Sequence, residues 1–474
     1  MEPQLAPAPT QLFGGAVTVQ DGQVTVADAS GLASEHMDAL VRQAVFGSDA
    51  EKEWARWVIW EIGQRVGVRP ASIHELYVAR GRGEVHGFTV PAMNVRASAY
   101  ETARAIFRTA IKLDAGAFIL EIARSEIAYT EQRPAEYVTV MLAAAMREGY
   151  RGPVFIQGDH FQVSAKKFAV DPATEVDAVK QLANEAIHAG FYNIDVDTST
   201  LVDLKQDTLD AQQRPNYENA VEITRYVRSL EPVGVTISIG GEIGEVGTEN
   251  STPEELRAFM DGFNRVLQAQ APGMAGLSKI SVQSGTSHGG VVLADGSIAD
   301  VALDLETLRK LGEIARDEYG LSGAVQHGAS TLPDSAFNSF PQTETAEIHL
   351  ATNFQNMMYE HIPADLRTEM YAWLSEHAND ERKPTDSDGQ FFYKARKKAI
   401  GPFKRRLWDL PSEVKAKLAA AYDAKFEFLF TQLGVQGTKP HVDRLVHAPE
   451  QRRAMPINGR PAVEAAPDDA DLSD

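Results

Sequence analysis

The sequence feature that most constrains the fold is a regular alternation of short apolar runs with amphipathic stretches, which begins near residue 86. Eight runs have the length and apolar content of buried strands, at 87–94, 117–122, 153–159, 191–197, 234–240, 279–284, 323–327 and 346–351. The helical patterns between them fall at 98–112, 134–148, 174–189, 215–229, 253–270 and 304–318. This order predicts an α/β protein with a (β/α)8 (TIM) barrel. An open sheet would more often carry a glycine-rich phosphate loop after its first strand, and the sequence has none there.

Side chains suited to metal binding follow several of these runs. His160, His288 and His327 each follow a strand-like run, and Glu242 follows a fourth. Barrel strands point their carboxyl ends at one axis, so we expect these side chains to meet. Because the chain has no cysteine, a metal would be held by His, Asp or Glu, and such ligands suit Zn²⁺ or another divalent ion. A single histidine at a strand end is more often structural, but three of them favour a metal site.

Two aspartates lie beside this predicted site. Asp159 directly precedes His160, and the glycine before it allows the strand to end there, so that both side chains face the metal. We predict that Asp159 takes part in catalysis. Asp197 shares a strand face with Asp195, and we predict that it binds the metal weakly or orients a ligand imidazole.

Glycine-rich turns follow two of the histidines, and small residues follow the last strand. Exposed backbone N–H groups in such turns can hold a phosphate without a lysine. The predicted phosphate-binding residues are Gly289, Gly328, Ser330, Ala351, Thr352 and Asn353. The alternative is that these segments are tight turns only.

An acidic loop over 241–249 has a glycine at every third position. One interpretation is a lid that carries a general base. The other is a solvated loop that contributes one metal ligand, Glu242. The sequence pattern fits both.

Three segments lie outside the predicted catalytic barrel, which covers 86–355. Residues 1–85 form an N-terminal extension that is mainly helical, with a short hairpin near 22–28. Residues 356–437 form a C-terminal helical extension. Residues 438–474 are rich in Pro, Ala and Asp, which predicts a disordered acidic tail.

Tryptophans spaced three apart mark one helix of the N-terminal extension. Trp54, Trp57 and Trp60 lie within a stretch of helical spacing over 35–66. Aromatic residues at this spacing usually fill a core. We therefore expect this helix to pack against the body of the protein or against a second subunit.

The net charge of the chain limits the classes of partner that it can bind. A net charge of −20 argues against a surface for nucleic acid or anionic membranes. A basic cluster over 394–406 is either a solvated helix face or a site for a distant phosphate group.

No apolar run approaches the ~18 residues that span a bilayer. Residues 1–13 lack the pattern of a secretory signal, so we expect a cytoplasmic protein.

Five motifs occur in order along the chain. They are Gly-Asp-His at 158–160, Ile-Asp-Val-Asp-Thr-Ser at 194–199, Gly-Glu-Ile-Gly at 241–244, Gly-Thr-Ser-His-Gly at 285–289 and His-Gly-Ala-Ser at 327–330. Together they resemble the motifs of class II, metal-dependent fructose-bisphosphate aldolases, and Val-Pro-Ala-Met-Asn-Val at 90–95 is similar to the first strand of that family. The resemblance implies a (β/α)8 barrel enzyme, dimeric or tetrameric. It would cleave a ketose bisphosphate, by default fructose 1,6-bisphosphate, into dihydroxyacetone phosphate and an aldehyde.

The resemblance also implies roles for individual residues. The matches to metal ligands, and to acids that the metal approaches in alternative positions, are His160, His288, His327, Glu242 and Asp197. Asp159 would move the proton of the hydroxyl next to the C–C bond that breaks. The residues that would hold the dihydroxyacetone phosphate end are Gly289, Gly328, Ser330, Ala351, Thr352 and Asn353, and Asn94 would lie near the substrate.

Three departures from the family pattern concern the substrate. The usual Asn-Ile-Asp-Thr after the last strand reads His349-Leu350-Ala351-Thr352, so a side chain that normally touches the enediolate has changed. The lysine that usually follows His-Gly is missing from 290–293. The usual Gly-Gly-Glu-Glu-Asp lid reads Gly-Thr-Glu-Asn at 247–250, which leaves Glu249 as the predicted base.

Two other functions fit part of the pattern. Glu121, the Gly-Asp-His motif and the stretch 242–249 are similar to the companion subunit of tagatose-bisphosphate aldolase, which is not catalytic alone. The three metal-binding histidines argue against such a subunit, because it has no need of a complete metal site. A metal-dependent hydrolase on the same barrel is a third hypothesis, and the glycine-rich phosphate turns argue against it.

Overall fold

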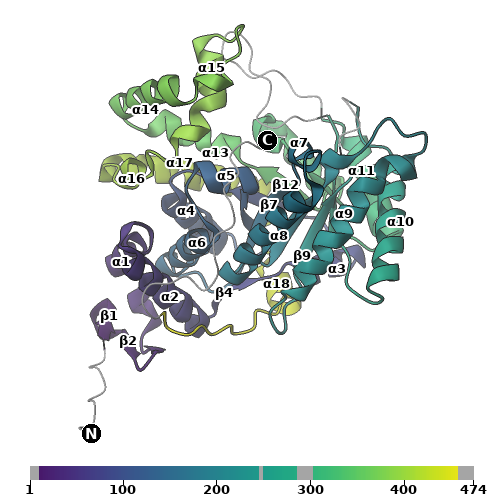
Figure 1. The fold of residues 1–474 in the computed structure, drawn as a ribbon. Helices are drawn as coiled ribbons and strands as arrows, with labels where there is room; N and C mark the ends of the chain where they lie inside the picture. The colour runs from purple at the N-terminus through teal and green to yellow at the C-terminus, as the bar shows by residue number, and fades with distance from the viewer. Residues whose placement is uncertain (1–9, 245–248, 286–302, 457–474) are drawn as a thin grey trace.

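A closed barrel of eight parallel strands forms the centre of the molecule. The computed structural model describes residues 10–244, 249–285 and 303–456 (Figure 1). The barrel strands are β5 (Val90–Asn94), β6 (Ile119–Ala123), β7 (Gly152–Gln162), β8 (Asn193–Asp197), β9 (Ser238–Glu242), β10 (Lys279–Val282), β11 (Ala324–Gln326) and β12 (Glu347–Leu350). Each pairs with the next along the chain, and β12 pairs with β5 to close the ring. The predicted (β/α)8 barrel is confirmed, and all eight strands lie within or beside the predicted runs.

Helices surround the barrel in the predicted alternation. The long ones are α4 (Ala99–Lys112), α6 (Pro134–Glu148), α8 (Pro172–Ala189), α9 (Leu209–Ser229), α10 (Pro253–Gln270), α11 (Leu305–Asp317) and α13 (Thr352–His361), and the short ones are α5 (Arg124–Tyr129), α7 (Ala165–Phe168) and α12 (Ser339–Gln342). Local sequence sets where they begin: Thr252 and Glu255 form a reciprocal capping box at the start of α10. Asp171 caps α8 directly ahead of Pro172. The helix α9 begins six residues earlier than the predicted 215–229 and carries Pro215 in its first turns.

An additional strand and a short helix close the bottom of the barrel. The strand β4 (Val68–Ala71) pairs in parallel with the first half of β7, and β8 pairs with the second half from Gln157 onward. The helix α3 (His74–Gly81) follows directly. Its buried Leu76 and Tyr77 share a hydrophobic cluster with Ala92 and Phe155 of the barrel strands. Residues 68–81 therefore belong to the core of the barrel, because they cover apolar side chains that the strands alone would leave exposed.

Residues 10–66 form a small sheet and two helices beside the barrel. The antiparallel strands β1 (Thr10–Leu12), β2 (Val17–Gln20) and β3 (Gln23–Val26) include the expected hairpin. The helices α1 (Glu35–Phe46) and α2 (Asp49–Val66) cover the predicted helical stretch. Both contact α6, one of the outer helices of the barrel.

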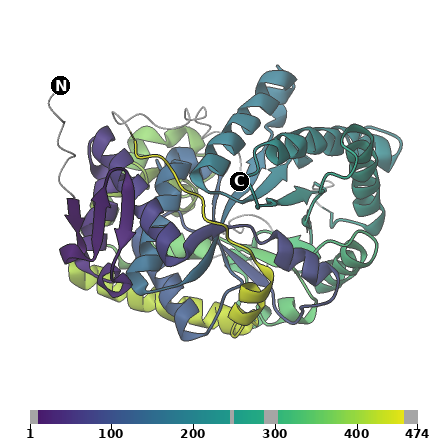
Figure 2. The ribbon, with the colours of Figure 1, turned by 90° about the horizontal axis from the view of Figure 1, so that it is seen from below.

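The end of the described chain runs back along α2. The indole N–H groups of Trp57 and Trp60 donate to the backbone oxygens of Arg453 and Gln451, and the Arg453 guanidinium lies 3.2 Å from the centre of the Trp60 ring. Figure 2 shows this yellow segment beside the purple N-terminal helices. A disordered tail from residue 438 is therefore wrong for 438–456: α18 (Lys439–Leu445) packs on α3, and the segment after it packs on the tryptophan-bearing helix α2.

The remaining helices of the C-terminal region lie above and beside the barrel (Figure 1). They are α14 (Ala364–His377), α15 (Asp388–Ala395), α16 (Lys404–Trp408) and α17 (Ser412–Gln432), and single-turn 3-10 helices occur at Phe13–Gly15, Ala29–Leu32, Ser199–Leu201, Ala329–Thr331, Asp334–Ala336, Asn379–Glu381 and Arg396–Ala399. The helix α17 packs on α4 and α13. None of the helices in the described ranges has the length and apolar character that a bilayer crossing demands.

The basic cluster over 394–406 is held by acidic and aromatic neighbours. Lys394, Lys398 and Arg406 form ion pairs with Asp386, Glu381 and Glu369. Lys404 pairs with Glu136, and Arg405 lies over the ring of Phe46. These contacts tie the C-terminal region together and connect it to the barrel. The cluster is therefore not a plain solvated helix face, and its phosphate-binding role stays a prediction.

Candidate metal centre

A bulge near the end of β7 brings two adjacent side chains to the same place. Gly158 pairs with Ile194 and Phe161 pairs with Val196, so the register shifts across Asp159 and His160. His160 has a left-handed backbone, with φ of 41°. A bulge turns residues that would otherwise alternate between the two faces of a strand. The expectation that Asp159 and His160 face one centre agrees with this geometry, although the strand continues to Gln162.

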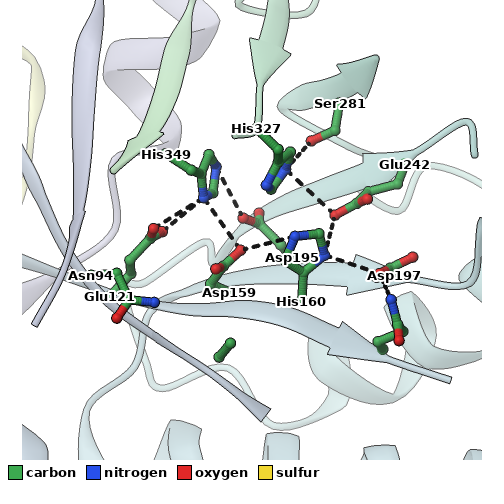
Figure 3. Close-up of polar contacts among 12 residues, drawn as sticks. Asn94, Glu121, Asp159, His160, Asp195, Asp197, Glu242, Ser281, His327 and His349 are labelled. Carbon is green, nitrogen blue, oxygen red and sulfur yellow. Dashed lines mark hydrogen bonds and ion pairs between the residues drawn. The ribbon is translucent and has the colours of Figure 1, made fainter. Parts of the chain in front are cut away.

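His160, Glu242 and His327 converge at the carboxyl ends of β7, β9 and β11 (Figure 3). Ligand atoms of the three side chains all lie within 4.8 Å of one another. The Glu242 Oε1 atom lies 3.1 Å from His160 Nδ1 and 3.6 Å from His327 Nε2. Two imidazoles and a carboxylate that converge in this way fit a divalent metal ion such as Zn²⁺.

Burial changes the pKa of the carboxylate in this group, Glu242. Glu242 is buried, and its Oε1 atom makes no hydrogen bond among the described residues. Burial first, and the nearby charge of Asp197 second, raise the pKa of Glu242 to about 7. Burial removes most of the solvent that would stabilise the charge of this carboxylate, and His160 offsets only part of the loss. A cation between Glu242 and the two imidazoles would supply that stabilisation.

Asp197 and Ser281 contact the same two ring nitrogens that face Glu242. Asp197 Oδ2 lies 3.0 Å from His160 Nδ1, and Ser281 Oγ lies 3.0 Å from His327 Nε2. Burial would raise the pKa of Asp197, but hydrogen bonds from His160, Ser199 and Gln162 hold it below its usual value. A group that orients a metal-binding imidazole contacts its other ring nitrogen, so this geometry fits a weak metal ligand better than an orienting group. Both predicted roles of Asp197 stay predictions.

A second group of side chains adjoins the first and is centred on His349 of β12. The His349 ring stacks on His327 at 3.9 Å between centroids. Its Nδ1 atom lies 3.0 Å from Glu121 Oε2 and 3.3 Å from Asp159 Oδ1. Burial lowers the pKa of His349, but the charges of Glu121 and Asp159 outweigh burial and raise the pKa well above its usual value. The residue that departs from the family pattern therefore touches the predicted catalytic aspartate.

The barrel axis below His349 is filled by a buried charged network. Lys279 Nζ lies 2.9 Å from Asp195 Oδ1, 2.6 Å from Glu347 Oε1 and 2.8 Å from Gln157 Oε1. His349 Nε2 lies 2.8 Å from the same Glu347 oxygen. The Tyr77 hydroxyl of α3 donates to Glu347 from the bottom of the barrel. The network thus connects the bottom of the barrel to the predicted active site.

Sequence reasoning did not assign a role to most of this network. A signal was present, because polar residues stand two apart inside otherwise apolar strands. Examples are Lys279 and Ser281 in β10, and Glu347 and His349 in β12. Such spacing places both side chains of a pair inside the barrel.

The predicted phosphate-binding residues fall into a described and an undescribed part. Gly328 has a left-handed backbone, with φ of 72°. Ser330 Oγ accepts a hydrogen bond of 2.6 Å from the backbone N–H of Ala351. Thr352 and Asn353 open α13, whose N-terminal N–H groups can hold an anion. The structure thus brings Ser330 and Ala351 together, and their phosphate role remains a prediction.

Four predicted residues need separate mention. His288 and Gly289 lie outside the described residues. Glu249 is exposed, and the groups of converging ligand atoms found in the described ranges do not include it. Asn94 is buried at the end of β5, where its amide donates to Glu126. Each of their predicted roles stays a prediction.

Comparisons with known proteins bear on this site and this fold. A family profile described as "Fructose-bisphosphate aldolase class-II" matches residues 81–407. No curated protein matches the chain.

Solved structures match the chain at low sequence identity. A fructose-bisphosphate aldolase from Campylobacter jejuni is 17% identical, with a TM-score of 0.45, over 77% of this chain and 97% of that one. The YdjI aldolase from Escherichia coli K12 is 13% identical, with a TM-score of 0.44, over 78% and 99%. The fructuronate-tagaturonate epimerase UxaE from Cohnella laeviribosi is 12% identical, with a TM-score of 0.50, over 73% and 81%.

The family profile covers more than half of the chain, including every strand of the barrel and the whole candidate metal centre. The closed barrel and the convergence of His160, Glu242 and His327 agree with it. The resemblance stated from five sequence motifs is thereby confirmed. The chain belongs to the class II fructose-bisphosphate aldolase family.

Proposed function

We propose that the protein is a divalent-metal-dependent aldolase that reversibly cleaves a ketose bisphosphate. The default substrate is fructose 1,6-bisphosphate, with dihydroxyacetone phosphate and glyceraldehyde 3-phosphate as products. The observation that carries the proposal is the meeting of His160, Glu242 and His327 at the carboxyl ends of three barrel strands, with Asp159 beside them. Such an arrangement offers a metal site and a proton-transfer group in one place.

Different residues would bind the metal and transfer the proton in the proposed reaction. His160, His327 and Glu242 would hold the ion, with the undescribed His288 as a further ligand. A bound divalent ion supplies electrophilic polarisation of the substrate carbonyl. Asp159 takes the proton from the hydroxyl next to the bond that breaks, and the neighbouring His349 holds its carboxylate in place at 3.3 Å.

The phosphate of the dihydroxyacetone half would bind where β11 and β12 end. Ser330 already contacts the backbone of Ala351 there, and α13 begins at the next residue. Backbone N–H groups at the start of a helix favour a negative charge. Gly328, in the turn after β11, has a left-handed backbone that glycine adopts at little cost.

Further aspects of function belong to the same proposal. Zn²⁺ is the proposed ion, because the ligands are imidazoles and carboxylates. We propose that the protein works in the cytoplasm as a homodimer or homotetramer, in carbohydrate metabolism. Nucleic acids and membranes are not among the proposed partners, given the net charge of −20.

A direct assay tests the reaction. Purified full-length protein, supplied with Zn²⁺, is offered fructose 1,6-bisphosphate and tagatose 1,6-bisphosphate separately, and dihydroxyacetone phosphate is detected by a coupled reaction. We expect cleavage of the fructose sugar and loss of cleavage when a chelator removes the metal. Preference for tagatose 1,6-bisphosphate would show that this sugar, and not fructose 1,6-bisphosphate, is the substrate. Cleavage of neither sugar, by protein that demonstrably holds metal, would refute the proposal.

A pair of variants tests the metal site separately from catalysis. His327→Ala should lose metal and activity together. His377→Ala is the matched control, because His377 is an exposed histidine stacked on Trp373 of α14. Full metal content in His327→Ala would show that His327 is not a metal ligand.

A further inference from the structure

A buried ion pair holds the side chain of Asn94, at the carboxyl end of β5, in one orientation. The Asn94 amide donates to the Glu126 carboxylate of α5, and its Oδ1 atom accepts a hydrogen bond of 3.3 Å from Arg96 Nε. The two partners also contact each other, with 2.6 Å between Arg96 Nη2 and Glu126 Oε1. All three residues are buried, with exposed fractions between 1% and 8%.

The chemistry of the two partners decides which end of the Asn94 amide faces which. A guanidinium only donates hydrogen bonds, and a carboxylate only accepts them. The amide oxygen of Asn94 must therefore face Arg96, and the amide nitrogen must face Glu126. A rotation of the amide by half a turn would set donor against donor and acceptor against acceptor. The ion pair thus determines where the N–H groups of Asn94 point.

Both partners of Asn94 are held in place by contacts of their own. Glu126 Oε2 accepts a hydrogen bond of 2.9 Å from the backbone N–H of Ala123, the residue before α5. A carboxylate in the first turn of a helix is stabilised by such N–H groups. The side-chain amide of Gln132 donates to the backbone oxygen of Arg96 at 2.9 Å. The ion pair is therefore a fixed frame for Asn94.

Asn94 lies between two predicted parts of the active site. Its register partner on β6 is Glu121, whose carboxylate lies 3.0 Å from His349 Nδ1 (Figure 3). On the other side, β12 ends where Leu350 pairs with Met93, so Asn94 is level with Ala351 in the predicted phosphate-binding turn.

The Asn94 amide has one N–H group to spare for a ligand. One N–H faces Glu126, and the second has no partner in the part of the chain that the structure describes. A buried N–H without a partner is costly, and an oxygen of a bound ligand would satisfy it.

We propose that Arg96 and Glu126 are positioning residues, which hold the Asn94 amide so that its second N–H donates to an oxygen of the dihydroxyacetone phosphate half of the substrate. The inference rests on the proposed function, which supplies the identity of this ligand. Both charged residues act through Asn94.

The substitution Glu126→Gln keeps the shape of the side chain and removes this control. If the oxygen of the new amide faces Arg96, its nitrogen is set against the N–H groups of Asn94 and Ala123. If the oxygen faces those N–H groups, the nitrogen is set against the guanidinium. A donor meets a donor in both cases, so the Asn94 amide is no longer held toward the ligand. Loss of a hydrogen bond to a charged ligand weakens binding about 10- to 100-fold.

Binding of dihydroxyacetone phosphate to full-length, Zn²⁺-loaded protein, measured by isothermal titration calorimetry, tests the inference. We expect Glu126→Gln and Asn94→Ala each to raise the Kd about 10- to 100-fold, with the metal content of the wild type. The double variant should bind as weakly as Asn94→Ala alone, because Glu126 acts through Asn94. A merely structural role of Glu126 would instead multiply the two losses. Glu75→Gln, at an exposed glutamate in the first turn of α3, is the matched control and should keep the wild-type Kd.

Arg96→Lys decides the question if Glu126→Gln does not fold, as judged by circular dichroism. A lysine keeps the positive charge beside Glu126, but one ammonium cannot hold both that carboxylate and Asn94 Oδ1 as the guanidinium fork does. The Kd should again rise, and should rise no further when Asn94→Ala is added.

The binding measurement separates this inference from the proposed function. A wild-type protein that binds dihydroxyacetone phosphate but cleaves neither sugar bisphosphate would refute the proposed function alone. A wild-type Kd in Glu126→Gln and Arg96→Lys, or losses that multiply with that of Asn94→Ala, would overturn the positioning roles alone. A wild-type protein that does not bind dihydroxyacetone phosphate would overturn them as well.

Discussion

The two ends of the barrel use the same strands for opposite purposes. At the carboxyl ends, histidines and carboxylates from β7, β9, β11 and β12 face one another. These titratable side chains are buried close together, whereas a stable core is mainly apolar. At the amino ends, α3 covers the opening with Leu76 and Tyr77, packed on apolar side chains of the strands. One end thus holds charge for chemistry, and the other buries apolar surface for stability.

Lys279 and Glu347 connect these two ends. Both lie on the barrel axis, and Glu347 contacts Tyr77 below and His349 above. Changes at the upper end should therefore affect activity more than stability, and changes at the lower end the reverse. Changes on the axis should affect both.

The largest expected effect is at the upper end. Asp159→Asn should lower kcat by about 10²- to 10⁴-fold, the usual contribution of a proton-transfer group. The ion bound by His160, Glu242 and His327 should remain. Steady-state kinetics and metal analysis measure the two outcomes. Asp177→Asn, at an exposed position of α8, is the control, and an Asp159→Asn enzyme with normal kcat would remove Asp159 from the mechanism.

The next effect lies on the axis. Lys279→Met leaves Asp195 and Glu347 buried without their shared cation, which should cost about 3 to 5 kcal/mol of unfolding free energy. Urea denaturation measures the cost. The same variant should also lower activity, because Glu347 orients His349. An enzyme with full activity would show that the two ends are uncoupled.

A cavity at the lower end should separate stability from activity. Leu76→Ala removes a fully buried side chain of α3 and should cost about 2 to 5 kcal/mol. At a temperature where the variant is folded, its kcat should stay close to that of the wild type, since α3 lies away from the predicted site. Leu204→Ala, at an exposed leucine, should change neither quantity. A large fall in kcat with unchanged stability would contradict the division between the ends.

The smallest effect is a pH dependence at the lower end. Burial, and secondarily the charge of Arg228, lower the pKa of His74 to about 4. Below the unfolded value of about 6.5, the unfolded chain binds a proton that the folded chain does not, so stability falls as pH drops from about 6.5 to 4. His74→Gln should reduce this loss by up to about 2 kcal/mol at pH 5. Urea denaturation at pH 7.5 and pH 5 measures it, and equal losses in both proteins would assign the acid sensitivity elsewhere.

Much of the fold could be predicted because its signals are local. Apolar runs, caps and prolines place β5 to β12 and the predicted outer helices within a few residues of their observed bounds, except that α9 begins six residues earlier. The packing of 446–456 on α2 could not be predicted, because it depends on contacts between Trp60 and Arg453, almost four hundred residues apart. The pairing of β4 with β7 is non-local in the same way.

The candidate site, like the fold, could be predicted in part from the sequence. The sequence by itself determined the barrel and the side chains at its strand ends, including His160, Asp159 and Glu242, because periodicity and motif order are properties of neighbouring residues. Only the tertiary structure decided that His349 stands against Asp159 and Glu121, and that Lys279 balances charge beneath them. The physical reason is that distance and burial, which govern metal binding and charge, arise only when strands far apart in the chain close into one barrel.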